Sequence, residues 1–170
     1  MYIETERLII RDLTPDMAQA VHENSLDEDN RRFVPDEVFE TVEDARETVE
    51  FLISQYGTED GPLVYSIFTR NGGENIGYVQ LAPIEEGWEI GYHIAKRQTG
   101  NGYATEAVRA FLPVIAAQKG LDCIYGICLC ANAASIEVMR RCGFTNLFTG
   151  VGAYQGEQCE IMRNIWRPSR

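Results

Sequence analysis

Residues 88–107 read WEIGYHIAKRQTGNGYATEA, and this stretch decides the fold. Large apolar side chains alternate along its first part, which predicts a β-strand over Trp88–Ala95. A glycine-containing turn over Lys96–Gly102 follows, and apolar residues then recur at helical spacing from Tyr103 onward. We therefore expect a strand, a tight loop and a helix whose apolar stripe packs on the sheet.

The loop between this strand and this helix has the properties of an anion site. Gly100 and Gly102 have no Cβ, so the backbone can turn tightly and approach a ligand closely. The first turn of a helix carries unpaired N–H groups and a partial positive charge, which favour phosphate, and Arg97 adds a cation nearby. A plain connection is the alternative, because the usual nucleotide-loop patterns are missing and Thr105 occupies the last glycine position of G-x-G-x-x-G.

Two blocks of residues together resemble the GNAT superfamily of N-acetyltransferases. Arg97-x-x-Gly100-x-Gly102 is similar to the acetyl-CoA pyrophosphate loop of that superfamily. Asn132-Ala-Ala-Ser135, followed by Cys-Gly-Phe at positions 142–144, is similar to its second cofactor element. The separation of the two blocks also fits, which makes the resemblance specific.

The opening of the chain extends the resemblance to nearly its whole length. Glu4-Thr-Glu-Arg-Leu-Ile-Ile-Arg11 is similar to the start of the RimJ/RimL-type branch. The resemblance implies an α+β GNAT fold in a single domain over residues 1–170. Its central sheet is expected to be splayed and mostly antiparallel, with about seven strands flanked by about four helices.

The resemblance implies acetyl-CoA as the cosubstrate. Its pantetheine arm is expected to lie between two parted strands, 88–95 and 123–130, against the backbone at Ile94. The amides of residues 98–103 would bind the pyrophosphate, and Asn132 would meet the coenzyme on the opposite wall. The implied cofactor-binding residues are Ile94, Arg97, Gln98, Thr99, Gly100, Asn101, Gly102, Tyr103, Asn132 and Ser135.

Glu89 is the candidate general base. A carboxylate in an otherwise apolar strand beside the splay needs partners or a raised pKa, which is the environment of tuned bases. Alternatively, Glu89 lies on the solvated face and pairs with an arginine. His93, two residues along the same face, could act instead or hold a proton-relay water.

Ser135 is the candidate general acid for the departing thiolate. Many superfamily members place a tyrosine in the second-block helix, where this chain has Met139. Ser135 is the nearest hydroxyl, and a serine at this place is thought to serve in the RimJ/RimL-type branch. Alternatively, Ser135 only caps the helix start alongside Asn132.

The amine acceptor is expected beside the segment Leu26–Phe39, which reads as a loop or a broken helix. The resemblance places this segment at the border of the acceptor site. Together with His93, its candidate acceptor-binding residues are Asp27, Glu28, Asp29, Phe33 and Phe39.

The charge of the chain is concentrated in its N-terminal third. Residues 1–60 hold 17 acidic and 5 basic side chains, a net of −12, whereas residues 61–170 hold 9 and 10, a net of +1. Binding to nucleic acid or anionic lipid depends on Lys and Arg, so neither partner is expected. A cationic acceptor is favoured, unless the acidic helices serve only to keep the protein soluble.

The resemblance implies acetyl transfer to a primary amine by direct attack in a ternary complex. The acceptor would be a protein N-terminus, as in the branch, or a small polycation such as a polyamine or an aminoglycoside. A rival hypothesis is a GNAT-like module that binds acyl-CoA without turnover, as a sensor or partner-binding subunit. The missing tyrosine supports this rival, and the intact loop, Glu89 and Ser135 argue against it.

Composition sets the remaining expectations. The chain of 170 residues is 45% hydrophobic and 24% charged, as in ordinary globular proteins. Its five cysteines lack zinc-site spacing, so we expect reduced thiols and no metal. No apolar run reaches the roughly 18 residues of a membrane span, and the acidic start is no secretory signal, so a cytoplasmic protein is expected. A homodimer through the last strands is suggested by analogy alone.

The rest of the chain alternates strands and helices. Thr14 is expected to cap a first helix, and Thr41 a second that runs to about Tyr56 through a capping box with Asp44. Pro113 is expected to kink or loosen the long helix that ends near Gly120. The predicted strands cover residues 4–12, 63–70, 75–82, 88–95, 123–130, 144–151 and 157–166.

Overall fold

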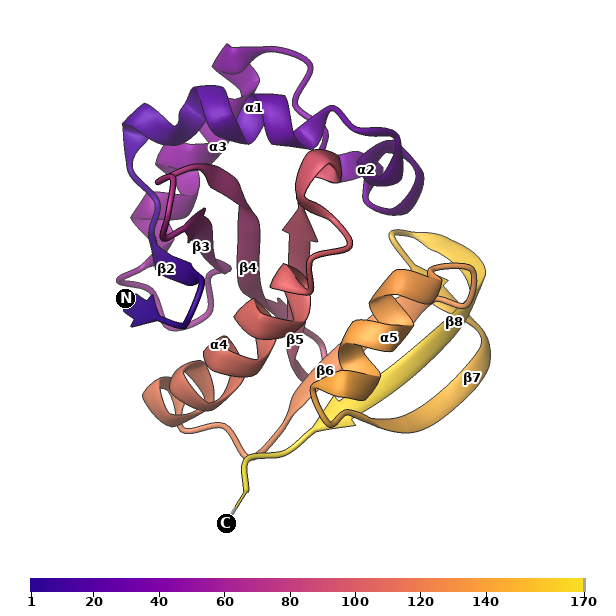
Figure 1. The fold of residues 1–170 in the computed structure, drawn as a ribbon. Coiled ribbons are helices and arrows are strands. Elements are labelled where there is room, and N and C mark those ends of the chain that lie inside the picture. The colour runs from indigo at the N-terminus through magenta and orange to yellow at the C-terminus, as the bar shows by residue number, and fades with distance from the viewer. Residues whose placement is uncertain (170) are drawn as a thin grey trace.

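The computed structural model describes residues 1–169, and its eight strands form one sheet in the order β1-β2-β3-β4-β5-β6-β8-β7 (Figure 1). Every neighbouring pair is antiparallel except β5 and β6, which are parallel. The strands are β1 (Tyr2–Glu4), β2 (Leu8–Asp12), β3 (Leu63–Thr69), β4 (Asn75–Ile84), β5 (Gly87–Ile94), β6 (Ile124–Leu129), β7 (Thr145–Tyr154) and β8 (Glu157–Trp166).

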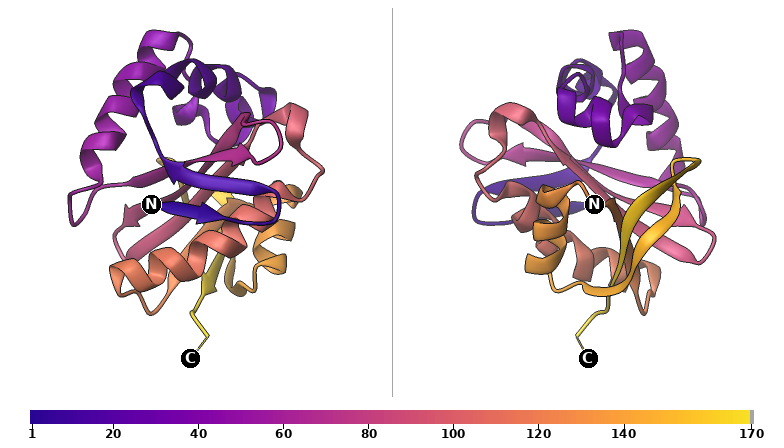
Figure 2. Two further views of the ribbon diagram at one scale, coloured as in Figure 1. Left: turned by 60° about the vertical axis from the view of Figure 1, so that its left-hand side comes forward. Right: turned by 90° about the vertical axis from the view of Figure 1, so that its right-hand side faces the viewer.

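Helices cover both faces of the sheet. Figure 2 shows α1, α2 and α3 on one side and α4 and α5 on the other. The helices are α1 (Ala18–Ser25), α2 (Glu28–Phe33), α3 (Val42–Gln55), α4 (Tyr103–Lys119) and α5 (Ala133–Arg141), with short 3-10 turns at η1 (Pro15–Met17), η2 (Pro35–Glu37) and η3 (Lys96–Gln98). No helix within residues 1–169 is long and apolar enough to cross a membrane.

The α+β architecture is confirmed, with one strand and one helix more than expected. The predicted edge strand over residues 4–12 is two strands, because the amide of Thr5 donates to the carbonyl of Leu8 at 2.9 Å and turns the chain back on itself. The segment predicted as a loop or broken helix contains α2 and η2. The prediction that Thr14 caps the first helix is wrong, since its side chain makes no capping bond and η1 precedes α1.

The capping box of α3 is confirmed, because Thr41 and Asp44 each accept a hydrogen bond from the other's backbone amide. Pro113 does not end α4 early, since the helix continues to Lys119 and Gly120 ends it at φ +66°, and the alternative of a kink at Pro113 stays a prediction. The buried stripe of α4 continues on both sides of the proline, from Phe111 to Ile115, and packing holds the helix together there.

The core lies mainly between α4 and strands β2 to β5. Its fully buried side chains include Phe111 and Ile115 of α4 and Ile10 and Ile67 of the sheet. A second, smaller cluster packs α1 and α3 on the opposite face, around Val49. Helices thus pack against both faces of the sheet at β2 to β5. Beyond β5, the helices leave one face of the sheet open.

The sheet parts between β5 and β6. Only one residue pair, Glu89 and Tyr125, joins these strands, whereas β6 and β8 share six. The alternation of β6 reflects this opening: Ile124 and Cys128 are buried, but Ile127 is only half-buried. One face of β6 therefore borders the opening. The predicted splay between β5 and β6 is confirmed.

Candidate active site

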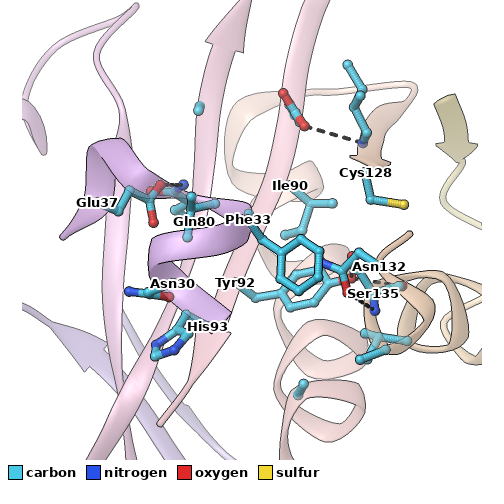
Figure 3. Close-up of a pocket in the computed structure, with 18 of the residues that line it drawn as sticks. Asn30, Phe33, Glu37, Gln80, Ile90, Tyr92, His93, Cys128, Asn132 and Ser135 are labelled. Carbon is cyan, nitrogen blue, oxygen red and sulfur yellow. Dashed lines mark hydrogen bonds between the residues drawn. The ribbon is translucent and has the colours of Figure 1, made fainter. Parts of the chain in front are cut away.

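A cavity of about 510 Å³ lies where β5 and β6 part. Figure 3 shows Glu37, Gln80 and Asn30 on one side of it, Cys128, Asn132 and Ser135 on the other, and Phe33, Ile90 and Tyr92 between them. The volume is in the range of small-molecule sites. The parting of one strand pair thus brings residues from α2, η2, β4, β5, β6 and α5 around a single space.

Glu89 stands at the apex of the parting strands and lines this cavity. Its Oε1 accepts a hydrogen bond from the amide of Ile127 at 3.3 Å, so the carboxylate bridges β5 to β6 just where backbone pairing stops. Burial raises the pKa of Glu89 to about 7, against the lowering effects of the Ile127 amide and the charge of Arg163. A half-buried carboxylate that titrates near neutrality can accept a proton there.

The edge of β5 that faces the opening presents free backbone. The amide of Ala95 donates to Ile76 of β4 at 2.8 Å, and neighbours on a strand point in alternate directions. The backbone groups of Tyr92 and Ile94 therefore point away from β4 and toward the gap. Ile94 is where the sequence resemblance places the pantetheine arm.

The loop after β5 presents unpaired amides. Gly100 and Gly102 adopt φ of +81° and +79°, a region that glycine enters without steric cost. None of the amides of residues 100–104 has a hydrogen-bond partner among residues 1–169. The amides of Gln98 and Thr99 differ, because they donate to carbonyls three residues earlier at 2.8 and 3.3 Å. The expectation of free amides therefore holds from residue 100 onward and is wrong for residues 98 and 99.

Arg97 does not face this loop. Its Nε donates to Glu74 at 2.7 Å, and its Nη1 donates to Asn24 at 2.9 Å. Its Nη2 contacts the carbonyl of Asn75 at 3.4 Å. The arginine thus ties the start of the loop to α1 and β4, where we had expected it to contact the pyrophosphate.

Arg7, which the sequence analysis did not single out, contacts the loop instead. Its Nη1 donates to the carbonyl of Asn101 at 2.9 Å, its Nε donates to Glu106 at 2.7 Å, and its guanidinium lies 4.8 Å from the centre of the Tyr103 ring. Burial raises the pKa of Glu106, but hydrogen bonds from Thr5 and Arg7 outweigh it and lower that pKa below its usual value. Arg7 and Glu106 together hold the loop against the start of the chain.

Ser135 lies on the far wall of the cavity, in the first turn of α5. The side chain of Asn132 accepts from its amide at 3.1 Å, so Asn132 supplies the cap of α5 and the Ser135 hydroxyl does not. The Ser135 hydroxyl lies 2.8 Å from the hydroxyl of Tyr92, whose pKa burial raises above its ordinary value. Met139 is 3% exposed and its sulfur accepts from Asn164 at 3.3 Å, so it serves the core. Tyr92 on β5 thus supplies a tyrosine hydroxyl beside Ser135.

Asp27 and His93 contact each other. Nε2 of His93 lies 3.0 Å from Oδ2 of Asp27, and both side chains are mostly buried. Burial raises the pKa of Asp27, but hydrogen bonds from His93 and from the amides of Asn30 and Lys96 outweigh it and lower that pKa to about 2. The pair links the start of α2 to the end of β5. Of the two residues, only His93 lines the cavity.

The remaining candidate acceptor-binding residues lie in different places, and only some of them line the cavity. Phe33 and Asp29 line the cavity, with Asp29 paired to Lys96 at 2.5 Å. Glu28 is exposed and does not line it. Phe39 lines a second cavity of about 450 Å³ beneath α1 and α3. Phe39 shares this second cavity with Glu37, Gln80 and His93, so the acceptor-binding roles expected of Glu28 and Phe39 stay predictions.

Two lining residues had no signal in the sequence analysis. Glu37 lies two positions after Pro35 in an acidic stretch, and Asn30 lies among charged residues. The path of α2 and η2 over the sheet brings both residues to the cavity, where Glu37 contacts Gln80 of β4. Within residues 1–169, no three His, Cys, Asp or Glu side chains are placed to hold a metal ion.

A splayed sheet, a loop of free amides and a carboxylate at the apex are the features expected of a GNAT acetyltransferase. The sequence profile of the acetyltransferase (GNAT) domain matches residues 7–145. The chain therefore belongs to the GNAT acetyltransferase family.

Relatives and solved structures agree with this membership. The chain is 30% identical over 145 residues to the N-acetyltransferase YnaD of Bacillus subtilis, covering 84% of this chain and 82% of YnaD. A GNAT-family acetyltransferase from Bacillus anthracis superposes with a TM-score of 0.83, 25% identity and 98% coverage of both chains. RimL, the ribosomal L7/L12 α-N-protein acetyltransferase solved with coenzyme A, shares the fold at a TM-score of 0.81, 22% identity and 98% coverage of both chains.

The buried carboxyls should make stability depend on pH. Burial raises the pKa of Glu37 and Glu89 from 4.5 to about 7, so the folded protein binds these protons more tightly than the unfolded chain. The free energy of unfolding should therefore fall as pH rises from about 4.5 to 7. Urea denaturation at pH 5 and pH 8 should show Glu37→Gln and Glu89→Gln each gaining about 1–3 kcal/mol over the wild type at pH 8 only.

The control for this measurement is Glu47→Gln, which removes an exposed carboxylate of α3. It should follow the wild type at both pH values. Equal stability differences at pH 5 and pH 8 would contradict the raised pKa values.

Proposed function

We propose that this acetyltransferase moves the acetyl group of acetyl-CoA directly to a primary amine in a ternary complex. Glu89 acts as general base and Ser135 as general acid. The observation that carries the proposal is the position of Glu89, which lies where β5 and β6 part and lines the cavity there.

The free backbone of this region fits acetyl-CoA. The gap-facing backbone of Ile94 can pair with the amides of the pantetheine arm, and the amides of residues 100–104 can bind the pyrophosphate. Asn132 closes the opposite wall from the start of α5. When bound there, acetyl-CoA supplies an activated acyl group with a thiolate as leaving group. Its relative in fold, RimL, was solved with coenzyme A.

Glu89 prepares the amine. An alkylamine titrates near 10.4 and is protonated at neutral pH, so a group in the site must take its proton before the nitrogen can attack. The Glu89 carboxylate faces the cavity and titrates at about 7, so it is available to accept that proton. Ser135, hydrogen-bonded to Tyr92 at 2.8 Å, then donates a proton to the departing sulfur, and the tyrosine can replace it.

The loop should be tested by paired glycine substitutions at the two ends of α4. Gly102→Ala and Gly120→Ala both place a Cβ on a backbone of positive φ, +79° and +66°, and neither Cβ would clash within the protein. Both should lose about 1 kcal/mol of stability. Only Gly102→Ala should weaken coenzyme A binding, by tenfold or more in isothermal titration calorimetry, because its Cβ obstructs the phosphates. Equal affinities for the two variants would exclude this loop as the site.

The base is tested by the pH profile of acetylation. In the wild type, kcat/KM should rise as pH increases through about 7, where Glu89 loses its proton. Glu89→Gln should lower the rate about 100-fold and move the rise to higher pH, where the amine deprotonates unaided. Glu85→Gln, in the exposed turn before β5, should keep the wild-type profile. An unchanged profile in Glu89→Gln would remove this residue from the mechanism.

The acid is tested by a double-mutant cycle. Ser135→Ala should lower kcat by about 10–100-fold, and Tyr92→Phe should lower it by a smaller factor, with little change in the KM of the amine. Because the two hydroxyls are expected to act as a unit, the double variant should be no slower than Ser135→Ala. Multiplicative losses would mean that the two residues act separately.

If the protein binds coenzyme A but no amine causes thiol release from acetyl-CoA, the protein is a binding module without turnover, and the proposed acetyl transfer is contradicted.

A further inference from the structure

We propose that the acceptor is a small amine with a second ammonium group, and that Glu37 and Asn30 bind this second ammonium. The inference rests on the proposed acetyl transfer and names the class of its substrate. It follows from the polar side chains at the α2 end of the cavity, which the catalytic roles of Glu89 and Ser135 leave unused (Figure 3).

Glu37 is held in place with half of its carboxylate unused. Its Oε1 accepts a hydrogen bond from Nε2 of Gln80 at 3.0 Å. Its Oε2 is buried and has no hydrogen-bond partner among residues 1–169. Gly91 makes this arrangement possible, because a Cβ there would lie 2.4 Å from Nε2 of Gln80. The absence of a side chain on β5 thus lets Gln80 lie across the strand and reach Glu37.

Asn30 adds a second unused group. It is 1% exposed, and neither its side-chain nitrogen nor its side-chain oxygen has a partner within the described residues 1–169. Its backbone is fixed, since its amide donates to Asp27 at 2.9 Å and its carbonyl accepts from Val34 at 2.9 Å. Buried polar groups without partners are rare in native proteins, and a ligand is one explanation for them. An ammonium has three donors, which can bond to Glu37 Oε2 and Asn30 Oδ1.

The charge of the cavity selects the class of acceptor. Among residues 1–169, four carboxylates and no lysine or arginine line the cavity. Asp29 is paired with Lys96, and Asp36 accepts from Gln155, which leaves Glu37 and Glu89 for the ligand. An acceptor that carries a carboxylate or a phosphate would meet like charge, so amino acids and nucleotides are disfavoured.

The spacing suits a short diamine. Glu89 and Gly91 lie two residues apart on one face of β5, about 7 Å along a strand. Glu37 contacts Gln80 above Gly91. When one ammonium of a short diamine binds Glu37, its other amine therefore lies near Glu89. The apolar side chain of Phe33 lines the same cavity, and a methylene chain can pack against it.

Three probes that each contain four carbons test the proposal: butylamine, 1,4-diaminobutane and 4-aminobutanoate. With acetyl-CoA and a thiol reagent, kcat/KM should be at least tenfold higher for the diamine than for butylamine, and lowest for the amino acid. Glu37→Gln should reduce the preference for the diamine over butylamine by at least tenfold. Glu47→Gln, which removes an exposed charge from the same acidic third, should keep the preference.

Equal rates for the diamine and butylamine, or a preference that survives Glu37→Gln, would overturn the proposal. Faster acetylation of a peptide N-terminus than of every small amine would also overturn it. If no amine is acetylated, the proposed acetyl transfer fails, and calorimetric titration with 1,4-diaminobutane still decides the subsite. Binding of the diamine that is at least tenfold tighter than that of butylamine, and is lost in Glu37→Gln, would support it, and equal binding would refute it.

Discussion

The separation of β5 from β6 after a single residue pair is the constraint on which the rest of the structure depends. Backbone pairing ends at Glu89 and Tyr125, and the Glu89 carboxylate takes the place of the next ladder bond by accepting from the Ile127 amide. A continuous sheet would have no cavity and no free strand edge here. Glu89 lies at this break, and its burial there raises its pKa to about 7.

Helix packing holds the two halves of the sheet, β1 to β5 and β6 to β8, in separate positions, and hydrogen bonds across the cavity mouth link them. Helix α4 fixes β2 to β5 from one face, and α5 packs beside β6. Across the cavity mouth, the hydroxyl of Tyr154 donates to the carbonyl of Phe33 at 3.1 Å, and Gln155 donates to Asp36 at 2.9 Å. The β7–β8 turn thus contacts the α2–η2 segment across the cavity.

The sequence predicted the fold well, because its signals are local. Alternation along β5, the glycines of the loop and the Thr41 capping box each lie within a few residues, and the structure contains all three. The catalytic candidates could be named from motifs. Long-range contacts could not: Arg7 meets Glu106 from 99 positions away, and Tyr92 meets Ser135 from 43. Arg97 was assigned to phosphate because its partners on α1 and β4 are not visible in a local pattern.

The central claim is that a coenzyme lies between the parted strands with its diphosphate on the loop after β5. Amide hydrogen exchange of the intact protein, measured by NMR with and without coenzyme A, tests this claim directly. The amides of residues 100–104 have no partner among residues 1–169 and should exchange rapidly in the free protein. Coenzyme A should slow them, together with the gap-facing amides of Tyr92 and Ile94. Unchanged exchange at these positions, with saturating coenzyme A present, would contradict the account.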